Sequence, residues 1–354
     1  TSQTSLSLLN LGQGAIVAVG LILVMWMAAA GVISGDNTIG DFVMVNTFLI
    51  QLYLPLNFLG VVYREIKRSL VDMDKMFELL EHKPDVVDAA NARELEVGPG
   101  QIDFENVSFG YSEERGILKN ISFQVPPGKT VAIVGPSGSG KSTISRLLFR
   151  FYDVDQGRIT IDGQDIRDVS QLSLRKAIGV VPQDTVLFND TIAYNIHYGN
   201  PEAPWEQVQE AAQLAQIHGF VESLPKGYET EVGERGLKLS GGEKQRVAIA
   251  RTILKGPRIL IFDEATSALD SHTEKEIQES LREVSKERTT LIVAHRLSTI
   301  IDADEILVLR QGEIMERGRH EELLKLGGEY SEMWKKQQKS EAQEQQASSI
   351  ENQP

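Results

Sequence analysis

A run of 26 residues without a charged side chain, Leu8–Ile33, places the strongest constraint on how this 354-residue chain can fold. A helix crosses a bilayer with about 20 apolar residues, so the run is long enough to span a membrane. A secretory signal would begin with basic residues and have a shorter apolar core, and a buried helix of a soluble protein is the other alternative. After a polar turn, Phe42–Tyr63 adds 22 uncharged residues, in which Pro55 is tolerated if neighbouring groups satisfy the freed carbonyl. The two runs predict a membrane-spanning helical hairpin.

The charges around the hairpin predict its orientation. The turn between the runs holds two aspartates and no cation, whereas basic residues follow the second run from Arg64 onward. Positive residues favour the cytoplasmic side, so the turn is predicted to face outward and the rest of the chain to lie in the cytoplasm. Apolar residues then recur at spacings of 4, 3, 4 and 3, at Ile66, Leu70, Met73, Phe77 and Leu80. This stripe, which would also suit packing on a soluble core, predicts that the second helix continues to near Pro84.

The remainder of the chain has the pattern of an α/β domain. Residues 84–100 are polar and contain Pro and Gly, so they are interpreted as a linker, and the tail 336–354 is predicted to be disordered. Between them, over 101–335, strand-like runs alternate with helical stretches, and the fully apolar strands are expected in the middle of a sheet. The predicted strands are IDFENVSFGY, ISFQV, TVAIVG, RITIDG, IGVVPQ, RILIFD, TTLIVAH and EILVLRQGEI.

Charge and cysteine content exclude several classes of function. The net charge is −14 and the pI is near 5.0, which argues against nucleic acid as a partner because phosphate contacts need a basic surface. The chain has no cysteine, so it has no disulfide framework, no thiolate metal site and no cysteine nucleophile.

Residues 135–142, GPSGSGKS, match the phosphate-loop pattern G-x-x-x-x-G-K-[ST] in full. They lie between the strand-like run TVAIV and a helix predicted to begin at Lys141, which is the context that the motif requires. Glycines let backbone N–H groups turn toward the β-phosphate, and the helix N-terminus adds partial positive charge. Lys141 is predicted to neutralise the β- and γ-phosphates, and the Ser142 hydroxyl to ligate Mg²⁺. The predicted nucleotide-binding residues here are Gly135, Ser137, Gly138, Ser139, Gly140, Lys141, Ser142 and Thr143.

Side chains near the ends of other strands are predicted to complete this site. Asp263 and Glu264 end an apolar strand, where acids are costly unless they serve a cation or hydrogen bonds, so Asp263 is assigned to Mg²⁺ and Glu264 to polarising the attacking water. His295 ends the next strand and would face the γ-phosphate or the water if the two strands are neighbours, although a lone histidine there is more often structural. Gln183 follows another strand and is predicted to reach Mg²⁺. Tyr111 is predicted to stack on adenine, against the alternative of an isolated surface tyrosine.

Taken together, these motifs resemble an ATP-binding cassette over residues 101–330. The matching elements, in the order and approximate spacing of the family, are Tyr111, the loop 135–142, Gln183, LSGGE at 239–243, ILIFDE at 259–264, SALD at 267–270 and His295. The resemblance implies a phosphate-loop α/β core, an antiparallel β part near the amino end and a helical subdomain around 185–250. Glu243 departs from the commonest signature, which has Gln, but the change is common in the family.

The resemblance also implies a homodimer that assembles around ATP. Two cassettes pair head to tail, so that Ser240, Gly241 and Gly242 of one subunit bind the γ-phosphate held by the other subunit's phosphate loop. Asp270 would lie at the seam. ATP and Mg²⁺ are the implied cofactors, and the subunits would separate after hydrolysis.

Two further stretches indicate the kind of cassette protein. TEVGERG resembles exporters rather than importers, and helices ahead of the cassette fit a half-transporter with six spans, of which this chain would hold the last two. NLGQ and the segment 55–80 closely resemble mitochondrial and bacterial exporters associated with heavy-metal tolerance and iron–sulfur-related export of glutathione compounds. That resemblance implies a substrate cavity with Asn10, Gln13, Gly60 and Arg64. Interhelical hydrogen bonding by Asn10 and Gln13, and membrane anchoring by Arg64, are the alternatives.

The sequence therefore predicts a membrane α-helical hairpin over 1–83, followed by an α/β phosphate-loop ATPase. Its predicted function is ATP-driven export of glutathione derivatives by a homodimer, with membrane lipid as a further partner. The predicted location is a bacterial inner membrane, or alternatively the mitochondrial inner membrane, with the cassette on the cytoplasmic or matrix side. Export of a lipid, peptide or drug is the main alternative. A soluble cassette ATPase of DNA repair or translation is less consistent with the two uncharged spans and the acidic charge.

Overall fold

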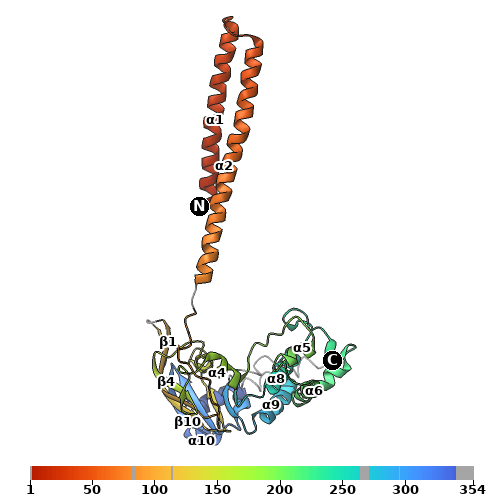
Figure 1. The fold of residues 1–354 in the computed structure, drawn as a ribbon. Helices are drawn as coiled ribbons and strands as arrows, with labels where there is room; N and C mark the ends of the chain where they lie inside the picture. The colour runs from red at the N-terminus through yellow and green to blue at the C-terminus, as the bar shows by residue number, and fades with distance from the viewer. Residues whose placement is uncertain (1, 82–83, 113–114, 264–270, 295, 340–354) are drawn as a thin grey trace. The chain divides into compact units, whose positions relative to one another are not determined.

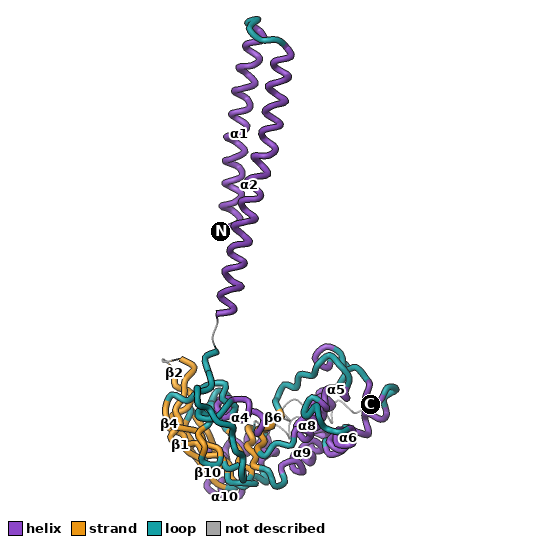
Figure 2. Tube along the Cα trace, in the orientation of Figure 1, coloured by secondary structure: helices purple, strands orange, loops and turns teal. Residues whose placement is uncertain are grey.

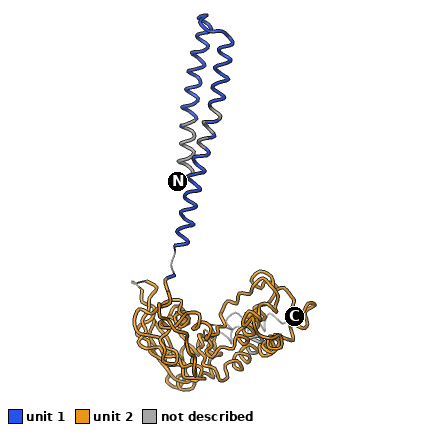
Figure 3. Tube along the Cα trace, in the orientation of Figure 1, with its two compact units in different colours: residues 1–84 blue, residues 85–354 orange. Residues whose placement is uncertain are grey.

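The computed structural model describes residues 2–81, 84–112, 115–263, 271–294 and 296–339, which belong to two compact units, 1–84 and 85–354 (Figure 3). The first unit is a hairpin of two helices that lie side by side, α1 (Ser2–Ile33) and α2 (Ile39–Glu81) (Figure 1). Helix α2 continues through Pro55 and ends three residues before Pro84. The prediction of one long second helix is confirmed.

The apolar surface of this hairpin is exposed. Within α1, the 20-residue segment Gly14–Ile33 has a mean hydropathy of 2.6 and is long and apolar enough to cross a membrane, and α2 begins with a shorter apolar segment, Ile39–Leu52. The stripe that begins at Ile66 and ends at Leu80 is also exposed at all five of its positions. Its residues therefore do not pack within their own unit.

The second unit contains two sheets. Figure 2 shows strands β1, β2 and β4 apart from helices α5, α6, α8 and α9, whereas α8 packs beside β6. An antiparallel sheet has the strand order β2-β1-β4-β5, and a six-stranded sheet has the order β10-β9-β3-β8-β7-β6, parallel except for β10. This is the architecture that the family resemblance implied. The strands are β1 (Ile102–Ser112), β2 (Arg115–Val125), β3 (Thr130–Val134), β4 (Gln156–Ile161), β5 (Gln164–Asp165), β6 (Ile178–Val181), β7 (Ile259–Asp263), β8 (Thr289–Val293), β9 (Glu305–Arg310) and β10 (Glu313–Gly318).

The helices of this unit pack on the six-stranded sheet or on one another. They are α3 (Lys141–Leu148), α4 (Gln171–Ala177), α5 (Ile192–His197), α6 (Trp205–Leu214), α7 (His218–Ser223), α8 (Gly241–Lys255), α9 (Ser271–Ser285) and α10 (His320–Leu326), with short 3₁₀ turns at Gly227–Glu229, Glu234–Gly236 and Leu297–Ile300. Residues 329–339 are also helical, so the predicted disordered tail begins too early: its first four residues, 336–339, continue a helix. Residues 340–354 lie outside the described residues.

The apolar strands are buried on both faces. In β3, Val131 and Ile133 pack in the cluster between the two sheets, whereas Ala132 and Val134 pack in a second cluster with β9. Successive side chains of a strand point to opposite faces, so a strand covered on both sides reads as a continuous apolar run. The expectation that such strands lie inside the sheet is confirmed.

One predicted strand is wrong. The run EILVLRQGEI forms two antiparallel strands, β9 and β10, which are joined by the two-residue turn Gln311-Gly312 with positive φ angles of 51° and 85°. A pair of positive φ angles is the geometry of the tight hairpin turns that match strand twist. Because Gln at the first turn position is not a common signal for such a turn, the apolar pattern on both sides concealed it.

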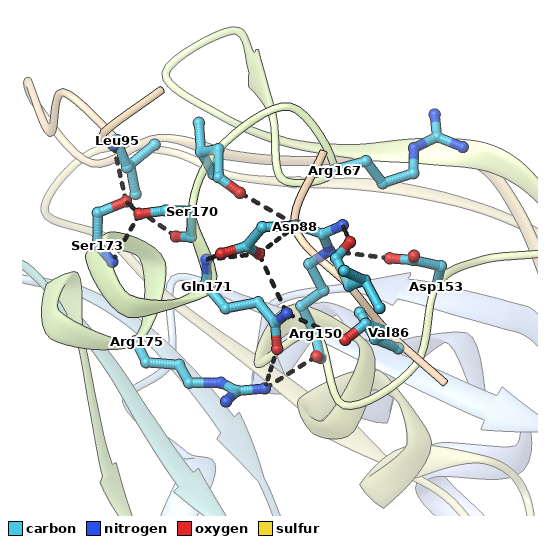
Figure 4. Close-up of polar contacts among 12 residues, drawn as sticks. Val86, Asp88, Leu95, Arg150, Asp153, Arg167, Ser170, Gln171, Ser173 and Arg175 are labelled. Carbon is cyan, nitrogen blue, oxygen red and sulfur yellow. Dashed lines mark hydrogen bonds and ion pairs between the residues drawn. The ribbon is translucent and has the colours of Figure 1, made fainter. Parts of the chain in front are cut away.

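The segment interpreted as a linker packs on the rest of the second unit, as Figure 4 shows. The Asp88 carboxylate accepts hydrogen bonds from the backbone N–H of Gln171 at 3.1 Å and from its side-chain Nε2 at 3.1 Å, and it lies 3.5 Å from Nη1 of Arg150. The side chain of Arg150 is only 3% exposed and also donates to the Val169 carbonyl. Asp88 thus fixes this segment to the first residue of α4 and to the loop after α3.

We expect Asp88→Ala to lower the free energy of unfolding by about 1–2 kcal/mol, because it removes an acceptor at a helix N-terminus and one partner of a buried guanidinium. Thermal unfolding of the detergent-solubilised chain measures this. Asp85→Ala, at an exposed aspartate three residues earlier, is the control and should stay within about 0.5 kcal/mol. Equal effects of the two substitutions would contradict the assigned role of Asp88.

Candidate functional site

The phosphate loop lies where the sequence predicts it, between the end of β3 and the start of α3. Gly135 has a φ of 153°, and a Cβ there would lie 2.0 Å from the Leu309 carbonyl oxygen, so only glycine fits. At the other end Gly140 is the N-cap of α3 and contributes no side-chain cap to the helix. The first N–H groups of a helix lack intrahelical acceptors, so this helix start is suited to an anion.

The Lys141 side chain folds back onto its own loop. Its Nζ donates to the carbonyl oxygens of Gly135 at 2.9 Å and Pro136 at 3.1 Å, and the residue is only 5% exposed. The neighbouring Ser139 hydroxyl is buried and has no hydrogen-bond partner among the described residues. A buried hydroxyl without a partner and a held ammonium group both suit a phosphate ligand, so the loop fits the triphosphate of ATP.

The acidic strand end lies at the same edge of the sheet as the phosphate loop. Asp263 ends β7 and pairs in register with Val293 of β8, and Ile133 of β3 pairs with the same Val293. The strands that lead to Asp263 and to His295 are therefore neighbours, as the sequence analysis required. Glu264, Asp270 and His295 themselves lie outside the described residues.

Gln183 lies two residues after β6, the strand beside β7, and is exposed. Gln245 of α8 holds this segment, although the sequence pattern does not single it out. Its Nε2 donates to the Pro182 carbonyl at 3.1 Å, and its Oε1 accepts from the Thr185 hydroxyl at 2.6 Å. Gln245 is 4% exposed, so α8 fixes both sides of Gln183 from the interior. Only the buried position of this glutamine, which the sequence does not reveal, distinguishes it from a surface residue.

These donors fit a magnesium ion that is shared with phosphates. Mg²⁺ is usually held by one or two carboxylates together with substrate phosphates and water. The oxygen atoms of Asp263, Ser142 and Gln183 are of the kind that such a site uses, and the assignment of these three residues to Mg²⁺ stays a prediction. Among the described residues no group of three or more His, Cys, Asp or Glu side chains gathers as an all-protein metal cage.

Gly241 and Gly242 begin the 15-residue helix α8, and Ser240 is its N-cap. The Ser240 backbone N–H donates to Glu243 Oε2 at 2.7 Å, and the Glu243 N–H donates to Ser240 Oγ at 3.3 Å, so the two residues form a capping box. Glutamine closes the same motif, which explains why Glu243 in place of Gln is compatible with the helix start. Ser240 and Gly241 are exposed and Gly242 is buried.

Of the remaining predicted site residues, Tyr111 lies beside the phosphate-loop helix, whereas Arg64 lies on the exposed surface of α2. The Tyr111 hydroxyl lies 3.3 Å from Thr143 Oγ1 on the phosphate-loop helix, and the residue is 45% exposed. Arg64 is exposed in α2, one turn after Gly60. Asn10 and Gln13 lie three residues apart in α1. The side chains of these two residues and the exposure of Gly60 are not among the described features.

Comparison with known proteins gives consistent matches. Residues 118–267 match the family model of the ABC transporter. The chain is 56% identical over 344 residues to the mitochondrial iron-sulfur clusters transporter atm1 of Aspergillus fumigatus, covering 96% of this chain and 47% of that protein. It is 57% identical over 340 residues to ATP-binding cassette sub-family B member 6 of Mesocricetus auratus, covering 96% and 40%.

A solved structure is similar along nearly the whole chain. It is a bacterial Atm1-family ABC exporter with ATP bound, with a TM-score of 0.74, 56% identity, and coverage of 95% of this chain and 59% of that one. The chain thus spans less than two thirds of the length of each of these relatives. It belongs to the ABC transporter family, and along nearly its whole length it is similar to members named Atm1, ABCB7 and sub-family B member 6.

Proposed function

We propose that this protein is the ATP-hydrolysing subunit of an exporter that moves glutathione derivatives or related compounds across a membrane. The observation that supports this most directly is the phosphate loop, whose carbonyl oxygens accept hydrogen bonds from Lys141. The same chain carries an apolar helix long enough to cross a membrane. The name of the fungal relative, an iron-sulfur clusters transporter, supports a related cargo.

The chain's own residues divide the ATPase chemistry between them. Lys141 and the N–H groups at the start of α3 bind the phosphates, and Asp263, Ser142 and Gln183 hold Mg²⁺, which neutralises phosphate charge when bound. Glu264 orients the attacking water and accepts its proton, and His295, two residues after β8 in the chain, is assigned to the γ-phosphate or the same water. Tyr111 stacks on the adenine ring.

We further propose that two subunits pair head to tail. Ser240, Gly241 and Gly242 then close the partner's phosphate loop, and Asp270 lies at the seam. The exposed start of α8, whose helix dipole favours anions, supports this arrangement. Two phosphate-binding elements in one chain would thereby serve two different nucleotides.

The substrate site is proposed at the end of the hairpin away from its turn. Asn10 lies 23 residues before the end of α1, and Gly60 lies 21 residues after the start of α2. At 1.5 Å per residue, Asn10, Gln13, Gly60 and Arg64 lie about 30–38 Å from the turn, so all four occupy the same end of the hairpin. A hydrocarbon layer of about 30 Å beginning at the turn would leave this end at the inner edge of the membrane, the side from which an exporter takes its cargo. That membrane belongs to a bacterium or a mitochondrion.

The test is the ATPase rate in lipid vesicles against increasing oxidised glutathione and a metal–glutathione complex. We expect saturable stimulation, and Arg64→Ala and Gln13→Ala should raise the half-maximal concentration about tenfold, because a charge-assisted hydrogen bond contributes about 1.5–3 kcal/mol. Arg68→Ala, one turn further along α2, is the matched control and should leave the titration unchanged. Stimulation by lipids or hydrophobic drugs alone would leave the ATPase assignment intact and contradict the glutathione cargo.

A further inference from the structure

The hydroxyl group of Tyr111 is held by the phosphate-loop helix. Arg146 of α3 donates from Nη1 to the Tyr111 oxygen at 3.0 Å, and Thr143 of the same helix lies 3.3 Å away through Oγ1. Thr143 is buried and Arg146 is exposed. The two contacts attach the end of β1 to the helix that begins at Lys141, although the residues are more than thirty positions apart in the chain.

The backbone and the ring of Tyr111 are also fixed. The N–H of Gly110 donates to Asp155 Oδ2 at 2.8 Å, which holds the strand end from the other side. The rings of Phe109 and Tyr152 each lie 5.1 Å from the Tyr111 ring at near-perpendicular angles of 85° and 83°. Neither of these two rings stacks on Tyr111 face to face, and 45% of the residue remains exposed to receive a flat ligand.

We propose that Arg146 is a positioning residue for the nucleobase of ATP, because its guanidinium holds the Tyr111 ring in the orientation on which the base stacks. A charged donor makes a stronger hydrogen bond to the phenol oxygen than the neutral Thr143 hydroxyl does. A planar guanidinium also loses less freedom than an ammonium when it holds such a bond. The assignment rests on the proposed function only in taking ATP as the ligand.

The chemistry of Arg146 is consistent with this role. Its hydrogen bond to the Tyr111 hydroxyl raises the pKa of the guanidinium above its ordinary value, with partial burial acting in the opposite direction. Lys141, five residues earlier on the same helix, turns instead to the loop carbonyls. One helix would therefore carry a cation for the phosphates at its start and a second cation for the base platform one and a half turns later. The competing role for Arg146 is direct attraction of the phosphates.

Ligands with and without a base separate these two roles. The detergent-solubilised chain is titrated calorimetrically with a non-hydrolysable imido analogue of ATP and with inorganic tripolyphosphate, each with Mg²⁺. We expect Arg146→Ala to weaken the ATP analogue about tenfold, which corresponds to about 1.4 kcal/mol, and to leave the affinity for tripolyphosphate unchanged. Tyr111→Phe, which keeps the ring and removes the hydroxyl, should give the same pattern. The double variant should be no weaker than either single variant, because both remove one interaction.

The controls make each outcome decisive. Arg158→Ala, which removes an exposed arginine paired with Glu105 on β1, should leave both affinities unchanged. Equal weakening of both ligands by Arg146→Ala, additive effects in the double variant, or no effect would each overturn the proposal. If Arg146→Ala does not fold, Tyr111→Phe with the same two ligands decides. Lys141→Ala should weaken binding of both ligands, and unchanged affinity for both in that variant would overturn the proposed function and this assignment with it.

Discussion

Lys141→Ala is expected to reduce the ATPase rate at saturating ATP by about 10²–10³-fold, the loss typical when one preorganised donor to a developing anion is removed. The ammonium group is already fixed by two carbonyl oxygens of its own loop, at 2.9 and 3.1 Å, before any nucleotide arrives. Its placement therefore costs little reorganisation when phosphate binds, which is why the loss should be large. Phosphate release in lipid vesicles measures the rate.

A lysine at the end of β3 away from the phosphate loop offers a matched control. Lys129 precedes β3 and pairs with Asp304 at 3.0 Å, with 54% of its side chain exposed. Lys129→Ala removes an equal charge from the other end of β3 and should leave the ATPase rate unchanged, because exposed ion pairs contribute about 0–1 kcal/mol. A Lys141→Ala variant that keeps more than about a tenth of the wild-type rate would contradict the assignment of this lysine.

Much of the fold could be predicted because its signals are local. The phosphate-loop pattern specifies a strand, a tight loop and a helix within about twenty residues, and β3 and α3 follow it. The length of α2 was predictable because an apolar run and a 3–4 stripe continue each other without a break, and Pro55 does not interrupt the helix. The prediction that His295 lies near Asp263 required the two strands before these residues to be neighbours. The sheet order places these strands, β7 and β8, side by side.

The contacts that complete the site were not predictable, because they join residues that are distant in the chain. Arg146 and Tyr111 are 35 residues apart, and Gln245 and Thr185 are 60 apart. Sequence periodicity reports which face of an element is buried but not which partner covers it. The supposed linker illustrates this point, because its polar residues suggested exposure although Asp88 pairs with a buried arginine.

Gly312→Ala is expected to destabilise the ATPase unit by about 2–5 kcal/mol, from the cost of a left-handed residue together with overpacking. Gly312 has a φ of 85°, and a Cβ there would lie 2.2 Å from the Ile117 carbonyl oxygen of β2. Its carbonyl accepts from the Lys119 N–H at 2.9 Å, so the turn cannot move away without breaking a bond to β2. Thermal unfolding of the detergent-solubilised chain measures the loss.

Gly163→Ala measures the backbone strain of a left-handed residue without the steric clash, because Gly163 occupies the equivalent position in the β4–β5 turn. Its φ is 77°, but a Cβ there meets nothing within 4 Å, so Gly163→Ala should cost only the left-handed term of about 1–2 kcal/mol. The two glycines also differ in what they support, because the Gly312 N–H donates to the Ser139 carbonyl of the phosphate loop at 3.1 Å. Gly312→Ala should therefore weaken ATP binding even below its melting temperature, whereas Gly163→Ala should not. Equal stability losses with unchanged ATP affinity in both variants would mean that the β9–β10 turn bends away from β2 without disturbing the loop, contrary to the close packing seen at Gly312.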